Sequence, residues 1–182
     1  MNPFFASWLR RAYWGVGQLR EALEAYLDIE TTGLFPYLND ITVIGIYLVH
    51  DKVGRFMQLV GEQVTKGNLL QALKGVDRIY TYNGSRFDLP FIQCALDVDL
   101  INNFQHHDLM YDCWRNNLYG GLKAVEQQLG IDRRLKDING YEAVRLWWKY
   151  QNERDRHALG TLLEYNKEDV LNLKTLREML LM

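Results

Sequence analysis

The hydrophobic and polar positions follow two different patterns along the chain. Short apolar runs separated by turns dominate the first half, whereas the second half repeats apolar residues at helical spacing. β-Branched and aromatic runs predict strands at residues 25–30, 41–50, 55–61, 77–83 and 103–109. Helical spacing predicts helices at 66–76 and 89–96, and a mostly helical region from about 109 to 182.

The connections between these segments predict how the strands pair. The first three strands are joined by links too short for a crossover helix, which favours an antiparallel meander. Helices in the later connections favour parallel pairing of the last two strands. We therefore predict an α/β fold at residues 25–182, with a mixed five-stranded sheet (three antiparallel strands, then two parallel) flanked by helices. Residues 1–24 are predicted to form an aromatic, amphipathic helical extension at the edge of this domain.

Length and composition limit the class of protein. A chain of 182 residues with 48% hydrophobic and 24% charged residues is typical of one soluble globular domain. Its apolar runs are far too short to cross a membrane, so no membrane partner is expected. Two cysteines do not make a disulfide framework, and the N-terminal order of aromatics before arginines is the reverse of a secretory signal. We expect a cytoplasmic protein.

The formal net charge of −2 argues against a protein that coats DNA through charge alone. It argues less against an enzyme that acts at one strand end, because bound metal ions supply local positive charge.

Two carboxylates share one face of the first predicted strand. Asp28 and Glu30, in the stretch YLDIETTGL, lie roughly 6.6 Å apart along a strand. Buried like charges at that separation repel unless a cation joins them, and Mg²⁺ and Mn²⁺ prefer carboxylate oxygens. A strand end that points two acidic side chains into water is an equally good interpretation of this motif alone.

Two further motifs carry acidic residues. Asp88 follows the fourth predicted strand, at the sheet edge where α/β folds bind ligands, although it also fits a helix cap. Tyr165 and Asp169 are four residues apart and therefore neighbours on one face of a helix. An exposed polar pair on an amphipathic helix is the alternative for these two residues.

The order and spacing of the three motifs resemble those of the DEDD exonucleases, 3′→5′ nucleases of the ribonuclease H-like superfamily. The segments YNGSRFDLPFI, HHDLMYDCWR, GGLKAVEQQLGI and YNKEDVLNL make residues 26–176 similar to the YprB-like predicted exonucleases. A tyrosine four residues before Asp169, in place of a histidine five residues before it, indicates the tyrosine (DEDDy) branch. The resemblance implies hydrolysis of phosphodiester bonds at nucleic-acid 3′ ends.

The resemblance also implies roles for individual residues. Two divalent ions, Mg²⁺ or Mn²⁺, would be held by four acidic residues: Asp28 as the bridging ligand, Glu30, Asp88 and Asp169. Tyr165 would orient the attacking water. The terminal nucleotide of single-stranded DNA or RNA would contact Thr31, Thr32, Gly33 and Leu34.

Other positions have weaker signals. Further candidates for substrate binding are Asn83, Phe87 and Lys123, with core packing as the alternative for Phe87 and an exposed helix position for Lys123. Asp108 follows two histidines and is expected to cap a helix rather than to bind a metal ion. A solvated helix with buried tryptophans is favoured over a nucleic-acid groove for Arg133, Arg134, Arg145, Trp147 and Trp148.

Two other functions are compatible with this pattern. One is a catalytically inactive module of the same fold that binds nucleic acid or a protein, and the other is a proofreading subunit that serves a polymerase in trans. The presence of all four acidic residues and of Tyr165 favours an active enzyme.

Overall fold

The structure is a computed structural model that describes residues 22–181. The predicted helical extension at residues 1–24 therefore lies almost entirely outside the described residues.

Five strands of the described chain form one mixed sheet in the order β3-β2-β1-β4-β5. They are β1 (Glu24–Thr31), β2 (Ile41–His50), β3 (Val53–Val60), β4 (Arg78–Thr81) and β5 (Gln105–Asp108). β2 pairs antiparallel with β1 and β3, whereas β4 pairs parallel with β1 and β5. The predicted fold class and strand pairing are confirmed; β2 has the predicted ends, and the ends of the other strands differ from the predicted ones by one or two residues.

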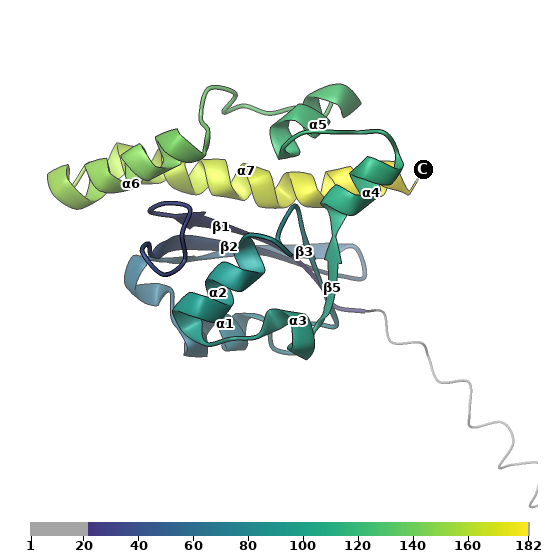
Figure 1. The fold of residues 1–182 in the computed structure, drawn as a ribbon, viewed down its shortest axis with the longest axis horizontal. Coiled ribbons are helices and arrows are strands. Elements are labelled where there is room, and N and C mark those ends of the chain that lie inside the picture. Colours follow the sequence, from purple (N-terminus) through teal and green to yellow (C-terminus); the bar gives the residue numbers. More distant parts are fainter. Residues whose placement is uncertain (1–21, 182) are drawn as a thin grey trace, which may run out of the picture.

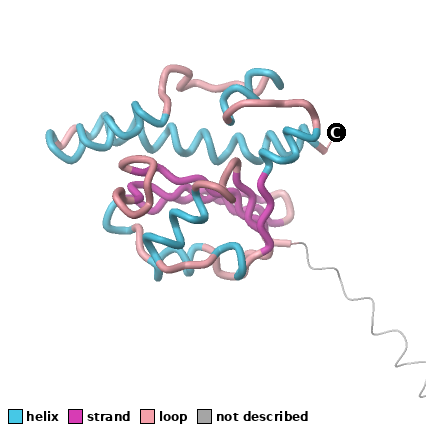
Figure 2. The backbone as a smooth tube through the Cα atoms, in the orientation of Figure 1, coloured by secondary structure: helices cyan, strands magenta, loops and turns pink. Residues whose placement is uncertain are grey.

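Helices cover both faces of this sheet (Figure 1). On one face lie α1 (Lys66–Ala72), α2 (Asp88–Leu96) and α3 (Leu100–Asn103). On the other lie α4 (Leu109–Arg115), α5 (Leu122–Leu129), α6 (Gly140–Glu153) and α7 (Arg156–Leu180). Figure 2 shows the same layers as a tube, with strands between two sets of helices. The 3₁₀ helix η2 (Gly61–Gln63) and α3 were not predicted, because such short helices show no apolar periodicity.

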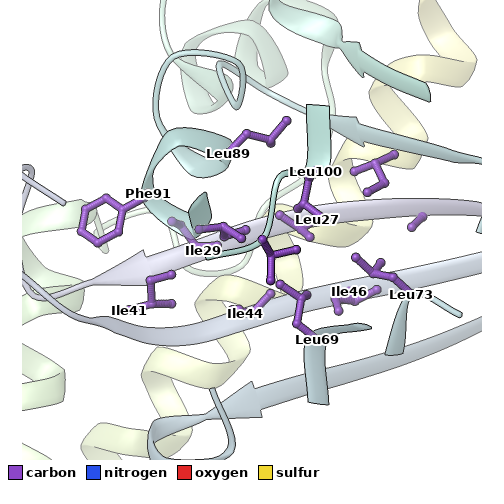
Figure 3. Packing of buried hydrophobic residues seen from close by; sticks show 14 of the residues in the cluster. Leu27, Ile29, Ile41, Ile44, Ile46, Leu69, Leu73, Leu89, Phe91 and Leu100 are labelled. Atoms are coloured by element: carbon purple, nitrogen blue, oxygen red, sulfur yellow. The ribbon is translucent and has the colours of Figure 1, made fainter. Parts of the chain in front are cut away.

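The central strand β1 is buried on both faces because helices cover both. Its odd-numbered residues, among them Leu27 and Ile29, pack into the hydrophobic cluster shown in Figure 3, which includes residues of α1 and α2. Its even-numbered residue Tyr26 packs in a second cluster with Val170 of α7. Since side chains alternate along a strand, Asp28 and Glu30 also lie on the α7 face.

Helix α7 crosses the sheet and contributes polar residues to its buried face (Figure 1). It has 25 residues and is therefore about 37 Å long. Tyr165, Asn166 and Asp169 are buried on it among leucine and valine side chains. No helix in the described region combines the length and apolarity needed to cross a membrane.

Helix α6 lies beside the first half of α7 (Figure 1). Asn139 caps its first turn, since its side chain accepts hydrogen bonds from the backbone N–H groups of Tyr141 and Glu142. Trp147 is buried at 8% exposure, whereas Trp148 is 47% exposed. The prediction of buried tryptophans is thus confirmed for Trp147 and wrong for Trp148, which lies at the helix surface.

Candidate active site

Three carboxylates meet where β1 ends. Asp28 and Glu30 project from β1, Asp169 projects from α7, and one oxygen of each lies within 4.8 Å of those of the other two. Glu30 and Asp169 are buried. The pairing of β1 with β2 becomes irregular directly after Glu30, one residue before the strand ends. The fold therefore brings the first and last predicted acidic motifs into one cluster.

Burial and mutual repulsion disfavour the simultaneous ionisation of these three carboxylates. Burial raises the pKa values of Asp28 and Glu30 well above their usual range, and the neighbouring Asp169 and Asp88 raise them further. Burial also raises the pKa of Asp169 to about 6, although the nearby Arg133 opposes this shift. Three close carboxylates ionise together only if a cation compensates them. Their oxygen atoms are the donors that Mg²⁺ and Mn²⁺ prefer, so these residues fit a divalent metal site.

Asp88 approaches the cluster from a third element. Asp88 is the first residue of α2, and the cap position is Phe87, which makes no side-chain cap bond. The Asp88 carboxylate instead accepts a hydrogen bond of 3.1 Å from the backbone N–H of Ile29, between Asp28 and Glu30. Burial raises its pKa to about 7. The alternative of a helix-capping Asp88 is therefore wrong, and this carboxylate lies close enough to Asp28 and Glu30 to raise their pKa values.

A cavity of about 650 Å³ lies over these carboxylates. It is lined by nearly all the predicted site residues: Asp28, Glu30, Thr31, Thr32, Gly33, Leu34, Asn83, Phe87, Asp88, Tyr165 and Asp169. Five lining residues were not predicted: Ile29, Tyr82, Gly140, Tyr141 and Val144. Asn139 is a recognisable signal for the start of a helix, but no motif indicates that this helix starts over the cavity. Phe87 also packs against the hydrophobic core, as its alternative interpretation predicted.

Lys123 lies beside the cavity rather than in its lining. Its Nζ is 4.8 Å from the centroid of the Tyr165 ring, is buried, and has no hydrogen-bond partner among residues 22–181. Burial lowers its pKa. The interpretation of Lys123 as an exposed helix lysine is therefore wrong, because its ammonium group lies against the face of Tyr165.

Arg133 neutralises two buried carboxylates. It lies between α5 and α6, is 7% exposed, and donates hydrogen bonds of 2.8 and 3.0 Å to the Glu126 carboxylate. Its Nη2 also pairs with Asp169. The solvated-helix interpretation is wrong for Arg133, whereas Arg134 and Arg145 are solvent-exposed. Sequence spacing does not reveal this network, because its members are distant along the chain.

Asp108 fixes the turn that precedes Asp88. Its carboxylate accepts hydrogen bonds from the backbone N–H groups of Met110 at 3.2 Å, Asn83 at 2.7 Å and Ser85 at 3.0 Å. The first of these bonds caps α4, so the predicted helix cap is confirmed. The other two hold the loop that carries Asn83 into the cavity.

Asn166 orients the carboxylate of Asp28. Its Nδ2 donates a hydrogen bond of 3.0 Å to Oδ2 of Asp28, and its Oδ1 accepts one of 2.9 Å from Nε2 of Gln58. Since Gln58 donates to the amide oxygen, only the amino group of Asn166 faces Asp28. Gly45 leaves room for this amide, because a Cβ there would lie 2.2 Å from Oδ1 of Asn166. Neither Asn166 nor Gln58 was predicted as a site residue, because both lie outside the recognisable acidic motifs.

Two curated proteins and a number of solved structures, among them NrnC of Brucella melitensis, are similar to this chain. Uncharacterised protein YprB of Bacillus subtilis is 31% identical over 166 residues, which cover 83% of this chain and 40% of that protein. Uncharacterised protein MJ0365 of Methanocaldococcus jannaschii is 31% identical over 160 residues, covering 81% and 89% of the two chains. The chain thus spans about two fifths of YprB but most of MJ0365. NrnC of Brucella melitensis bound to pGG has a TM-score of 0.60 at 22% identity, covering 90% of this chain and 74% of NrnC, which shows the shared fold.

A family model places the chain more directly. The RNase_H_2 model, described as RNase_H superfamily, matches residues 25–181, which is the whole sheet and its flanking helices. The chain therefore belongs to the ribonuclease H-like superfamily.

Proposed function

We propose that this protein is a metal-dependent 3′→5′ exonuclease of the tyrosine (DEDDy) branch. The observation that carries the proposal is the single cavity in which Asp28, Glu30, Asp169 and Asp88 converge beside Tyr165. Such a concentration of buried carboxylates is unfavourable for a purely structural protein and suits one that binds divalent metal ions. Membership of the ribonuclease H-like superfamily and a fold shared with NrnC, which binds pGG, support a nucleic-acid substrate.

The acidic residues have different roles in binding the metal ions. Asp28, Glu30 and Asp169 are close enough to share ions, and the backbone bond from Ile29 holds the Asp88 carboxylate at the edge of the group. When bound, a pair of divalent ions lowers the pKa of the attacking water and stabilises the leaving oxygen. Asn166 keeps one oxygen of Asp28 occupied, which directs the other toward the shared site.

Tyr165 acts in this proposal as a hydrogen-bond donor. Burial raises the pKa of its phenol above its ordinary value, and the carboxylates of Asp169, Glu30 and Asp28 raise it further. The hydroxyl therefore stays protonated at neutral pH and does not serve as a base. Its role is to orient the attacking water in the cavity that it lines.

The apolar walls of the cavity suit the terminal base of an unpaired strand. Leu34, Phe87 and Tyr141 line it from three different segments of the chain, and aromatic and apolar side chains hold single-stranded bases by stacking. Thr31 donates a hydrogen bond of 2.6 Å to the Gly33 carbonyl, which holds the loop beside the acidic residues.

The proposal predicts release of nucleotides from a labelled 3′ end. Purified protein is incubated with 3′-labelled single-stranded DNA or RNA in the presence of Mn²⁺, Mg²⁺ or a chelator. Labelled mononucleotide is expected at the earliest times with metal, and none with chelator, because the acidic residues alone supply no activated water. The same strand labelled at its 5′ end is expected to shorten in single-nucleotide steps.

Variants of α7 control for contamination. Asp169→Asn is expected to remove the activity, whereas Glu178→Gln, at an exposed position of the same helix, is expected to keep it. Internal fragments from the 5′-labelled strand, or equal activity in Asp169→Asn, would refute an exonuclease at this site.

A second prediction concerns the residue that orients Asp28. Asn166→Ala is expected to weaken Mn²⁺ binding and to slow turnover by about 10–100-fold, as loss of a hydrogen bond to a metal ligand commonly does. Gln58→Leu is expected to act in the same direction but less strongly, because it frees the Asn166 amide without deleting it. Electron paramagnetic resonance of Mn²⁺ without nucleic acid measures the affinity, and circular dichroism verifies the fold. Unchanged Mn²⁺ affinity in both variants would contradict the orienting role.

A further inference from the structure

One face of α6 lines two neighbouring cavities. Its first turns line the cavity over the acidic residues through Gly140, Tyr141 and Val144. Its remaining turns and the residue that follows them line a second cavity of about 860 Å³ through Trp147, Trp148, Tyr150, Gln151 and Arg154. Most of these positions recur at intervals of three and four residues, so they lie on the same side of the helix. α6 therefore forms a continuous wall, about 21 Å long, along both cavities.

The two cavities meet at Thr32, which lines both. The backbone N–H of Thr32 donates a hydrogen bond of 2.9 Å to the Asp40 carbonyl, and the Asp40 N–H donates one of 2.9 Å to Oγ1 of Thr32. These bonds close the β1–β2 loop at its base. The second cavity, which we call the Trp148 groove, lies directly across this closed base from the acidic site.

The side chains of the Trp148 groove suit unpaired bases. Trp148 is 47% exposed, and an indole offers a flat face for stacking. Oγ1 of Thr42, which lines the groove from β2, is buried and has no hydrogen-bond partner among the described residues. A buried hydroxyl without a partner is unfavourable unless a ligand completes it. The amide of Gln151 adds a donor and an acceptor for base edges.

The charges of the groove favour bases inside it and phosphates outside. Asp40 and Glu62 line the groove and would repel a buried phosphate. Arg154 lines it as an exposed residue and forms no ion pair within residues 22–181, which leaves its guanidinium available to a phosphate. A strand with its bases turned inward and its backbone turned outward matches this distribution of charge.

We propose that the Trp148 groove binds unpaired nucleobases of the strand whose 3′ end enters the acidic site. This inference rests on the proposed exonuclease function and extends it to the preferred substrate. The site cavity alone accommodates the end of a strand, whereas the groove adds contacts only for nucleotides further from that end. The protein therefore prefers single strands of several nucleotides to the shortest products.

Comparing substrates of two lengths distinguishes binding in the Trp148 groove from binding at the acidic site. Trp148→Ala is expected to raise KM about 5–150-fold for a ten-nucleotide single strand, because stacking of one base contributes about 1–3 kcal/mol. The same variant is expected to keep the KM of the protein for a dinucleotide and the kcat for both substrates. Trp114→Ala, at a 38% exposed tryptophan of α4, is the matched control and is expected to change neither KM. Thr42→Val, which keeps the shape of the buried residue, is expected to raise the ten-nucleotide KM as well.

A direct binding measurement keeps this proposal separate from the proposed function. Fluorescence anisotropy of a labelled ten-nucleotide strand is recorded with Asp169→Asn protein, with and without Trp148→Ala. Weaker binding of the strand by the double variant supports the groove whether or not the unaltered protein hydrolyses the strand. Absence of hydrolysis by the unaltered protein would contradict only the proposed exonuclease function. Equal binding, or an equal loss for the dinucleotide and the longer strand, would overturn the groove.

Discussion

Asp28→Asn is expected to abolish cleavage and, without metal, to leave the protein at least as stable as the unaltered chain. Asp28 lies in a buried group of carboxylates, where burial and the neighbouring Asp169 raise its pKa. The asparagine has the same shape but no charge, so it removes the repulsion between Asp28 and the neighbouring carboxylates. Activity is therefore expected to fall while the stability of the metal-free protein is kept or rises. Turnover is expected to fall by at least about 10³-fold, since the loss of even one fixed electrostatic contact at an active site costs about 10²–10³.

Thermal unfolding measures the other half of this prediction. A carboxylate whose pKa is raised in the folded state binds its proton more tightly there than in the unfolded chain. The metal-free protein therefore loses stability as the pH rises from the unfolded pKa toward the folded value, about 6 for Asp169 and about 7 for Asp88. Mg²⁺ is expected to raise the Tm of the unaltered protein by mass action and to have little effect on Asp28→Asn. An equal Mg²⁺ response in both proteins would place the metal elsewhere.

Arg133→Met is expected to lower the free energy of unfolding by about 3–5 kcal/mol, a large fraction of the stability of a domain of this size. The substitution leaves Glu126, which is 1% exposed, and Asp169 without their shared counter-ion. Removing one partner of a buried ion pair has this cost because the remaining charge stays out of water. Urea unfolding measures the loss, and Arg134→Met is the matched control, because its ion pair with Glu164 is exposed and contributes little.

The pH dependence of this variant provides a further check. Without the guanidinium, which opposes the upward shift of the Asp169 pKa, that pKa rises further in the folded protein, so protonation of Asp169 stabilises the folded state. The deficit of Arg133→Met relative to the unaltered chain is therefore expected to grow from about pH 5 to about pH 8. Glu126→Gln in the same chain is expected to recover part of the loss, since it removes one uncompensated charge. A deficit that is independent of pH would indicate lost packing rather than lost charge.

The strand pairing of the sheet was predictable because the lengths of the connections between strands constrain it. The links around β2 leave no room for a helix, so antiparallel pairing follows, and the helices before β4 and β5 require parallel pairing. The convergence of Asp28 and Asp88 also follows, because the ends of neighbouring parallel strands meet at one sheet edge. The short elements η2 and α3 were missed, since three or four residues carry too little periodicity to be recognised.

The supporting residues of the site were less predictable for a physical reason. Arg133, Asn166 and Gln58 belong to residue types that are usually exposed. Arg133 and Asn166 are buried and Gln58 is half-buried, and this depends on partners that are distant in sequence. Arg133 reaches Asp169 from a loop, and its own neighbours in the chain suggest a solvated surface. Trp148 shows the reverse case, in which an aromatic residue expected in the core lies at the wall of a groove.

The hydrogen bond between Ile29 and Asp88, together with the position of Asp169 on α7, has a consequence during protein synthesis. A nascent polypeptide that has emerged only as far as α6 holds the early acidic residues but lacks Asp169 and the helix that covers them. Such a fragment has no complete binding place for cations and is expected to leave the nucleic acids around the ribosome intact. On the proposed function, nuclease activity would thus appear only after α7 has been synthesised and folded, because Asp169 lies late in the sequence.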